Sequence, residues 1–152
     1  MKKNVLFLLS LVASKMVFAE TLLFECGDNC VAELNEKGVL TVKGTGENGV
    51  GQIGDFPHYT SPWWDVNEQI TNIVVEEGIT SIGKGAFFMT YAKNIFLPSS
   101  IENIADSAFT GMGDFNIVCA QDKRALCEEA KTRSKSSVYI DEQGEIIQQD
   151  LV

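Results

Sequence analysis

"NIVVEEGITSIGKGAF" (residues 72–87) and "NIFLPSSIENIADSAF" (residues 94–109) align without a gap, and this repetition decides the fold. A third, partial copy, "NIVCAQD", begins at residue 116, so the copies start at residues 72, 94 and 116. The Asn-Ile pair opens all three copies, and Ala-Phe closes the first two. A fixed period in the range of about 20–29 residues is typical of solenoids, in which each coil stacks on the next.

One copy contains two apolar edges. The β-branched run Ile73-Val74-Val75 predicts a strand, and the turn residues that follow lead the chain away from it. Ile79 and Ile82 then predict a second, less regular edge. A single coil could not bury both edges, so the copies are expected to stack.

These residues resemble the BspA-like bacterial leucine-rich repeats, whose repeat is similar to I-x-I-P-x-S-V-x-x-I-G-x-x-A-F. The lead-in also matches, with "CGDN" at residues 26–29, "GVLTVKGTG" at 38–46 and a Pro-Trp pair at 62–63. The resemblance covers residues 26–119. The chain departs from the pattern in three ways: it has few repeats, no cysteine after Ala-Phe and no leucine before the next strand.

What the resemblance implies is a binding module and not a catalyst. Members of the family are typically exported or surface-exposed bacterial proteins that bind other proteins or host surfaces. It names no particular partner.

The flanks are expected to cap the repeats. Residues 30–43 predict a β-hairpin with Gly38 in the left-handed position of its turn, and residues 44–57, with five glycines, predict a mobile loop. Asp122 is a candidate N-cap of a helix, and residues 137–148 predict a second hairpin. The expected fold is mainly β with short helices: a short leucine-rich-repeat-type solenoid, capped by an N-terminal hairpin and by a C-terminal helix plus hairpin.

The first nineteen residues read as a signal peptide. Two lysines precede a short apolar run at residues 5–12, and Val17-Phe18-Ala19 places small residues before a cleavage site at Glu20. The expected organisation is a signal peptide (1–19), an N-terminal hairpin and capping loop (20–69), repeats (70–119) and a C-terminal cap (120–152). Residues 20–152 then form one compact exported domain, periplasmic, secreted or on the cell surface.

Charge argues against two classes of partner. The full chain carries 12 basic and 21 acidic residues, a net charge of −9. Three lysines leave with the signal peptide, so nine basic residues face 21 acidic ones and the mature net charge is −12. Such a surface repels phosphate backbones and anionic lipid. We therefore expect neither nucleic acid binding nor membrane insertion after cleavage.

Four cysteines in an exported chain predict disulfides, with three pairings available, and make zinc the minor alternative. Cys119 occupies the repeat position of Val75 and Leu97, so it should point inward, toward a helix that carries Cys127. Cys26 and Cys30, separated by a turn-forming trio, are then the other pair. No metal site or cofactor is expected.

The segment "HYTSPWWDV" (58–66) allows two interpretations. His58, Tyr59 and Trp64 could form a small-ligand or glycan site, because aromatic faces suit sugars and histidine titrates near neutrality. Trp63 is instead expected to close the open end of the first repeat. A catalytic triad finds no support, since the single histidine has no serine partner in a G-x-S-x-G motif.

Strand alternation predicts the partner-binding residues. If Ile73 and Val75 point into the coil, Val74 points outward, and its equivalents are Phe96 and Val118. This apolar row could contact a partner, reflect β-propensity alone, or be covered by the C-terminal hairpin. The function expected is a non-catalytic protein-interaction or adhesion module, possible partners including host or cell-surface proteins; the alternative is the glycan or small-ligand site.

Overall fold

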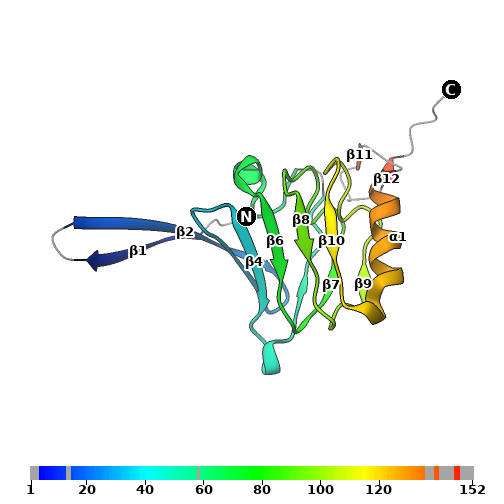
Figure 1. Ribbon diagram of the computed structural model, residues 1–152, viewed down its shortest axis with the longest axis horizontal. Coiled ribbons are helices and arrows are strands. Elements are labelled where there is room, and N and C mark those ends of the chain that lie inside the picture. Colours follow the sequence, from blue (N-terminus) through cyan, green and yellow to red (C-terminus); the bar gives the residue numbers. More distant parts are fainter. Residues whose placement is uncertain (1–3, 13–14, 58, 136–138, 141–145, 148–152) are drawn as a thin grey trace.

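The computed structural model describes residues 4–12, 15–57, 59–135, 139–140 and 146–147 and shows two facing sheets closed by a helix (Figure 1). The larger sheet has the strand order β1-β2-β3-β4-β6-β8-β10. Its strands are β1 (Asn4–Val12), β2 (Lys15–Gly27), β3 (Cys30–Leu34), β4 (Val39–Gly44), β6 (Asn72–Val75), β8 (Asn94–Phe96) and β10 (Asn116–Val118).

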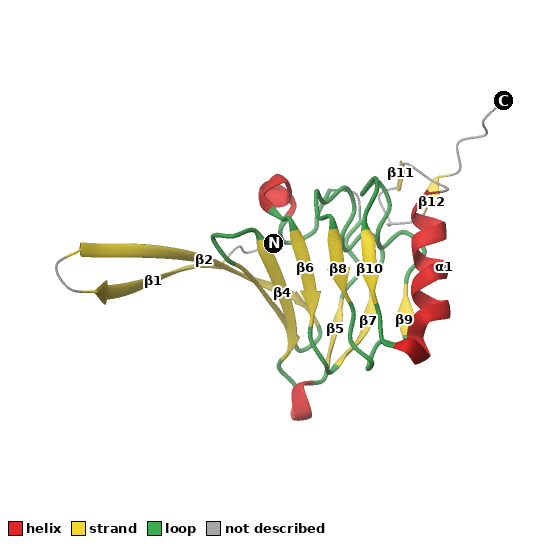
Figure 2. Cartoon of the chain, in the orientation of Figure 1, coloured by secondary structure: helices red, strands yellow, loops and turns green. Residues whose placement is uncertain are grey.

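The smaller sheet lies across the core from the larger one. It has the order β5-β7-β9, all parallel, with β5 (Gly51–Ile53), β7 (Ile79–Ile82) and β9 (Asn103–Ile104). The helical elements, drawn red in Figure 2, are the 3₁₀ turns η1 (Glu47–Gly49), η2 (Trp64–Gln69) and η3 (Gln121–Lys123) and the helix α1 (Arg124–Lys135). Two short strands, β11 (Tyr139–Ile140) and β12 (Ile146–Ile147), pair with each other beyond α1.

The N-terminal hairpin continues directly into the solenoid. Strands β3 and β4 are antiparallel, and β4 then pairs in parallel with β6, the first repeat strand. The repeat strands stay in register, so Ile73, Ile95 and Ile117 are direct neighbours. The short solenoid with an N-terminal hairpin and a C-terminal helix is therefore confirmed.

A column of aromatic rings runs through the core. Trp63 stacks on Phe87 with 5.4 Å between ring centroids, Phe87 on Phe109 at 5.9 Å, and Phe109 meets Phe115 at 5.6 Å. All four side chains are buried. The repeated Ala-Phe of the sequence thus supplies the middle of the column, and Trp63 supplies its N-terminal end.

Asparagine side chains tie successive coils together on the surface. Asn94 Nδ2 donates to Asn72 Oδ1 at 3.0 Å, and Asn116 Nδ2 donates to Asn94 Oδ1 at 3.3 Å. Each amide is both donor and acceptor, so a row of them can continue across a stack of parallel strands. This bonding explains why asparagine opens every copy.

A carboxylate clamps the turn of the first repeat onto the second. The Oε1 atom of Glu77 accepts from the hydroxyl and the backbone N–H of Ser99, both at 2.7 Å, and Oε2 accepts from Ser100 N–H at 3.2 Å. These bonds favour the ionised form, and those from Ser99 contribute most to lowering the pKa of Glu77. Gly78 follows with φ +105°, where a Cβ would lie 2.0 Å from Gly49 O, so only glycine fits.

The helix α1 closes the C-terminal end. It buries Cys127 and Ala130 and stands against β9 and β10, while Lys131 Nζ lies 5.8 Å from the Phe115 ring centroid. Arg133 pairs with Asp106 of the last repeat. These contacts confirm the C-terminal helix as a lid on the aromatic column.

The segment expected to be a signal peptide forms β1 and the beginning of β2, which extend from the body as a long arm (Figure 1). β1 pairs with β2 along its length, whereas β2 pairs with β3 only from Leu22 onward. Cleavage before Glu20 would therefore leave every β2–β3 pair in place. No helix among the described residues is long and apolar enough to cross a membrane.

Two local expectations were wrong. Residues 44–57 are not a continuous loop, because β5 lies within them and pairs with β7; the alternation of exposed Gln52 with buried Gly51 and Ile53 makes the strand possible despite the glycines. Asp122 does not cap the helix, because it lies inside η3, which precedes α1 and extends its N-terminus. Of the expected hairpin at 137–148, β11 and β12 are present, and its turn at 141–145 lies outside the described residues.

Candidate functional site

The outer face of the larger sheet carries a row of apolar side chains across the repeats. Cross-strand pairing places Val74 beside Phe96 and Phe96 beside Val118. Phe96 is 40% exposed and Val118 50% exposed, whereas Ile73 and Val75 are buried. We call Val74, Phe96 and Val118 the apolar row. The expected alternation of inward and outward side chains is present in β6. The strands β11 and β12 of the C-terminal hairpin do not pair with this sheet.

The surroundings of the apolar row are polar on two sides. Asn72, Asn94 and Asn116, which we call the asparagine row, lie two residues earlier on the same strands and therefore on the same face. Toward the N-terminal hairpin the row continues as Thr41 and Glu33, and Glu33 pairs with Lys43 at 2.9 Å. The face thus changes from polar over the hairpin to apolar over the repeats.

Beyond β10 the same face descends into a groove against α1. The groove encloses about 560 Å³ and is lined by Val118 and the disulfide residues Cys119 and Cys127, together with charged side chains of the helix such as Arg124 and Lys131. No described strand pairs with the outer edge of β10. The apolar row, the groove and this strand edge form one continuous surface.

The two cysteine pairs lie near opposite ends of the repeats. The structure joins Cys26 to Cys30, with Cα atoms 5.1 Å apart, and Cys119 to Cys127, with Cα atoms 6.7 Å apart. The first pair closes the turn between β2 and β3, and the second ties β10 to the helix lid. Among the described residues, no group of three or more His, Cys, Asp and Glu side chains could hold a metal.

The aromatic segment before the repeats divides into a buried and a partly exposed part. Trp63 is completely buried and donates from Nε1 to Ala86 O at 3.0 Å, which places it in the core, as expected. Trp64 and Tyr59 lie on the outside, with ring centroids 4.8 Å apart, and both contact Phe88. The structure thus brings together two of the three residues of the ligand-site interpretation; His58 lies outside the described residues.

A hollow of about 400 Å³ adjoins Trp64 on η2. Met89 and Tyr91, from the loop that follows Phe88, form its other side and are 41% and 58% exposed. Sequence reasoning missed both residues, because neither recurs in the next copy, where Gly111 and Gly113 take their places.

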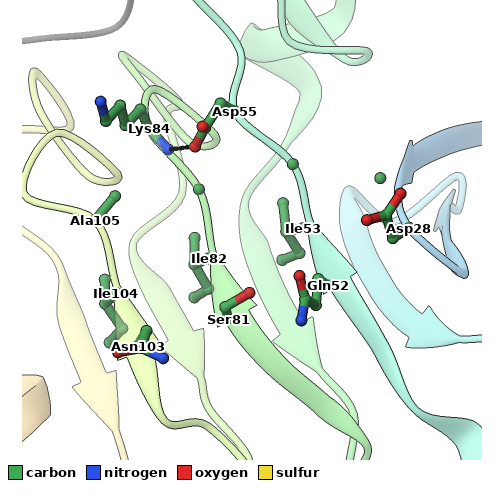
Figure 3. A pocket seen from close by; sticks show the side chains of 13 residues that line it. Asp28, Gln52, Ile53, Asp55, Ser81, Ile82, Lys84, Asn103, Ile104 and Ala105 are labelled. Atoms are coloured by element: carbon green, nitrogen blue, oxygen red, sulfur yellow. Dashed lines mark hydrogen bonds between the residues drawn. The ribbon is translucent and has the colours of Figure 1, made fainter.

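The smaller sheet presents a third, polar surface. In Figure 3, Ile53, Ile82 and Ile104 lie in a row on successive strands, and Gln52, Ser81 and Asn103 lie beside them along a groove of about 600 Å³. Lys84 N–H donates to Asp55 Oδ1 at 2.8 Å across one end. The signal that could have revealed β5 is the polar-Ile pair Gln52-Ile53, which matches Ser81-Ile82 and Asn103-Ile104.

Comparison with known proteins agrees with this architecture. The chain is similar in structure to a leucine-rich repeat protein from Eubacterium ventriosum ATCC 27560, solved at 2.50 Å resolution, with a TM-score of 0.60 and 24% identity. The similarity covers 66% of this chain and 26% of the relative, so this chain spans about a quarter of that protein's length. Comparison with curated proteins gave no match.

The sequence itself matches the family model of the BspA type leucine rich repeat region (6 copies) over residues 65–148, which is more than half of the chain. The matched span begins at η2, contains every coil described above and extends beyond α1. With the 22-residue copies, parallel register and capped column, this match shows that the chain belongs to the BspA-type leucine-rich repeat family.

Proposed function

We propose that this protein is an exported, non-catalytic protein-interaction or adhesion module whose contact surface is the apolar row of the larger sheet. The observation that carries the proposal is Phe96, whose aromatic ring is 40% exposed between Val74 and Val118. Aromatic side chains are enriched at the centres of protein interfaces, and contiguous exposed apolar patches commonly mark them.

Two further features support a protein as the partner. The asparagine row beside the apolar row offers amide donors and acceptors, the usual polar border of an interface. The net charge of −9 disfavours nucleic acid. Host and cell-surface proteins are the class of partner that an exported adhesion module would meet.

The N-terminal segment supports the proposed export, and the two cysteine pairs agree with it. Val17-Phe18-Ala19 meets the small-residue rule of a signal peptidase site, and paired cysteines are typical of oxidising compartments. N-terminal sequencing of the protein recovered outside the cytoplasm should begin at Glu20. Recovery of the intact N-terminus in the cytoplasm alone would contradict export.

A capture experiment tests the contact surface. The chain from residue 20 is immobilised as wild type, as Phe96→Glu and as Gln52→Glu, the last placing the same charge on an exposed position of the smaller sheet. Circular dichroism first establishes that all three are folded. Proteins from the native surroundings that bind wild type and Gln52→Glu should be lost with Phe96→Glu. Capture of the same proteins by Phe96→Glu would contradict the apolar row as the contact surface.

A further inference from the structure

The hollow beside η2 has the chemistry of a site for a positive charge. We call it the η2 pocket and define it by Trp64, Asp65, Asn67, Glu68, Met89 and Tyr91. It lies outside the apolar row and encloses about 400 Å³, enough for one long side chain.

Aromatic and thioether groups form one part of the η2 pocket. Tyr91 is the most exposed large apolar side chain described, at 58%, and Met89 is 41% exposed. The Trp64 ring is partly exposed and is supported from behind by contacts with Tyr59 and Phe88. Exposed tyrosine and tryptophan faces attract cations through their π systems.

The polar groups of the η2 pocket are predominantly acceptors. Asp65 and Glu68 are exposed carboxylates, and no lysine or arginine lines the pocket among the described residues. Asn67 is only 6% exposed, and its Nδ2 donates to Met89 O at 2.7 Å. That bond fixes the orientation of the amide, so the remaining atom is the acceptor Oδ1, which has no partner among the described residues.

The backbone at Met89 is held in an unfavourable conformation. Met89 has φ +55°, and the residue at the same place in the next coil is Gly111 with φ +76°. Glycine adopts this left-handed region readily, whereas methionine does so at a cost. At this position the first repeat therefore has Met89, whose side chain lines the pocket, whereas the second repeat has Gly111, which suits the backbone conformation.

We propose that the η2 pocket binds a cationic side chain, arginine or lysine, of the protein partner. The inference rests on the proposed function and adds the chemistry of the partner: a basic segment that places one charge between Trp64, Tyr91 and the two carboxylates. The acidic net charge of the chain would steer such a segment toward it. A neutral sugar would gain neither the attraction of a cation to the aromatic faces nor its attraction to the carboxylates.

The test uses small probes, so that it does not depend on identifying the partner. The folded protein is titrated with the tripeptides acetyl-Gly-Arg-Gly-amide and acetyl-Gly-Lys-Gly-amide, with the neutral citrulline analogue and with maltotriose, while the indole N–H signals are followed by NMR. We expect the Trp64 signal to shift saturably with both cationic tripeptides. Trp63 is completely buried, and its signal is the internal reference. Added salt should weaken binding.

Three variants separate a binding role from a structural one. Glu68→Gln should weaken the arginine tripeptide about two- to five-fold, whereas Glu102→Gln, a matched loss of charge near β9, should not. Met89→Gly removes a side chain that lines the η2 pocket, so it should weaken binding by a similar factor. It should not lower the melting temperature, because glycine readily adopts the left-handed backbone conformation of this position.

The inference is overturned if the cationic tripeptides leave the Trp64 signal unchanged, or if citrulline or maltotriose shifts it with equal affinity. Phe96→Glu should bind the arginine tripeptide like wild type, because the apolar row and the η2 pocket are separate surfaces. Loss of partner capture in that variant thus tests the proposed function, and the tripeptide titration tests the pocket.

Discussion

Replacement of Trp63 by alanine should be among the most destabilising single changes in this chain. The ring is completely buried, stacks on Phe87 at 5.4 Å and meets Phe24 and Phe56 edge-on at 6.2 and 6.1 Å. Its Nε1 also donates to Ala86 O. One residue thus joins β2, the loop before the repeats and the first coil.

The magnitude follows from two contributions. Truncating a buried Phe or Trp to alanine costs about 3–5 kcal/mol, because the apolar surface is lost and the cavity collapses only partly. Removing the donor to the buried Ala86 carbonyl adds about 1 kcal/mol. The sum, about 5 kcal/mol, is comparable with the whole stability of many domains of this size. The melting temperature should fall by about 20 °C.

The assay is urea unfolding followed by circular dichroism, because the substitution removes one of the two fluorescent tryptophans. With a slope of about 2 kcal/mol per molar urea, the midpoint should fall by about 2–3 M. Trp63→Phe is the matched control: it keeps a ring on Phe87 and loses only the hydrogen bond and some area, so its cost should be about 2 kcal/mol.

An unfolding midpoint of Trp63→Ala within about 0.5 M of wild type would refute the role of this ring as the end of the core. If the alanine and phenylalanine variants lost the same free energy of unfolding, the hydrogen bond and not the packing would dominate. That result would refute the division of the loss given above.

Three other predictions concern separate parts of the fold. Phe96→Glu should change the free energy of unfolding by no more than about 1 kcal/mol, because the ring is 40% exposed; cooperative unfolding at a much lower temperature would mean that it is a core residue. Glu77→Gln should be less stable than wild type at pH 7 in urea titrations. Hydrogen bonds from Ser99 lower the pKa of Glu77 in the folded state, so the extra stability of wild type over the variant is fully present above the ordinary pKa of 4.5. This extra stability should shrink as the pH falls through the folded-state pKa. A stability difference between the two proteins that is as large at about pH 3 as at pH 7 would contradict this origin. Non-reducing peptide maps should link Cys119 only to Cys127, and any peptide joining either to the N-terminal cysteines would refute the pairing.

The architecture could be predicted from the sequence because the same side chains recur at the same positions in successive copies. Phe87 and Phe109 recur since they stack on each other, and Asn72 and Asn94 recur since they bond to each other. Residues that interact with their own equivalents must keep the period, so the core and the register can be found from the period alone.

Features that occur once could not be found in that way. The Gln52-Ile53 pair of β5 matches Ser81-Ile82, but Ile53 lies 29 residues before Ile82 and not 22, so the period of the copies does not locate this strand. The η2 pocket is lined by Met89, whose backbone has a positive φ that no local sequence pattern predicts. Asp122 resembles a cap, but the preceding 3₁₀ turn begins at Gln121 and includes it.

The asparagine row has a consequence for the length of the protein. Asn94 donates to Asn72 and accepts from Asn116, so each amide uses the same two groups in the same direction. An internal duplication of residues 72–93 would place one more asparagine, a second Asn72, in the row and one more phenylalanine, a second Phe87, in the aromatic column. Neither Trp63 nor the helix α1 would need to change. Unequal recombination can therefore lengthen or shorten this protein by whole coils, and the length of its apolar row can evolve without renewed selection on either end.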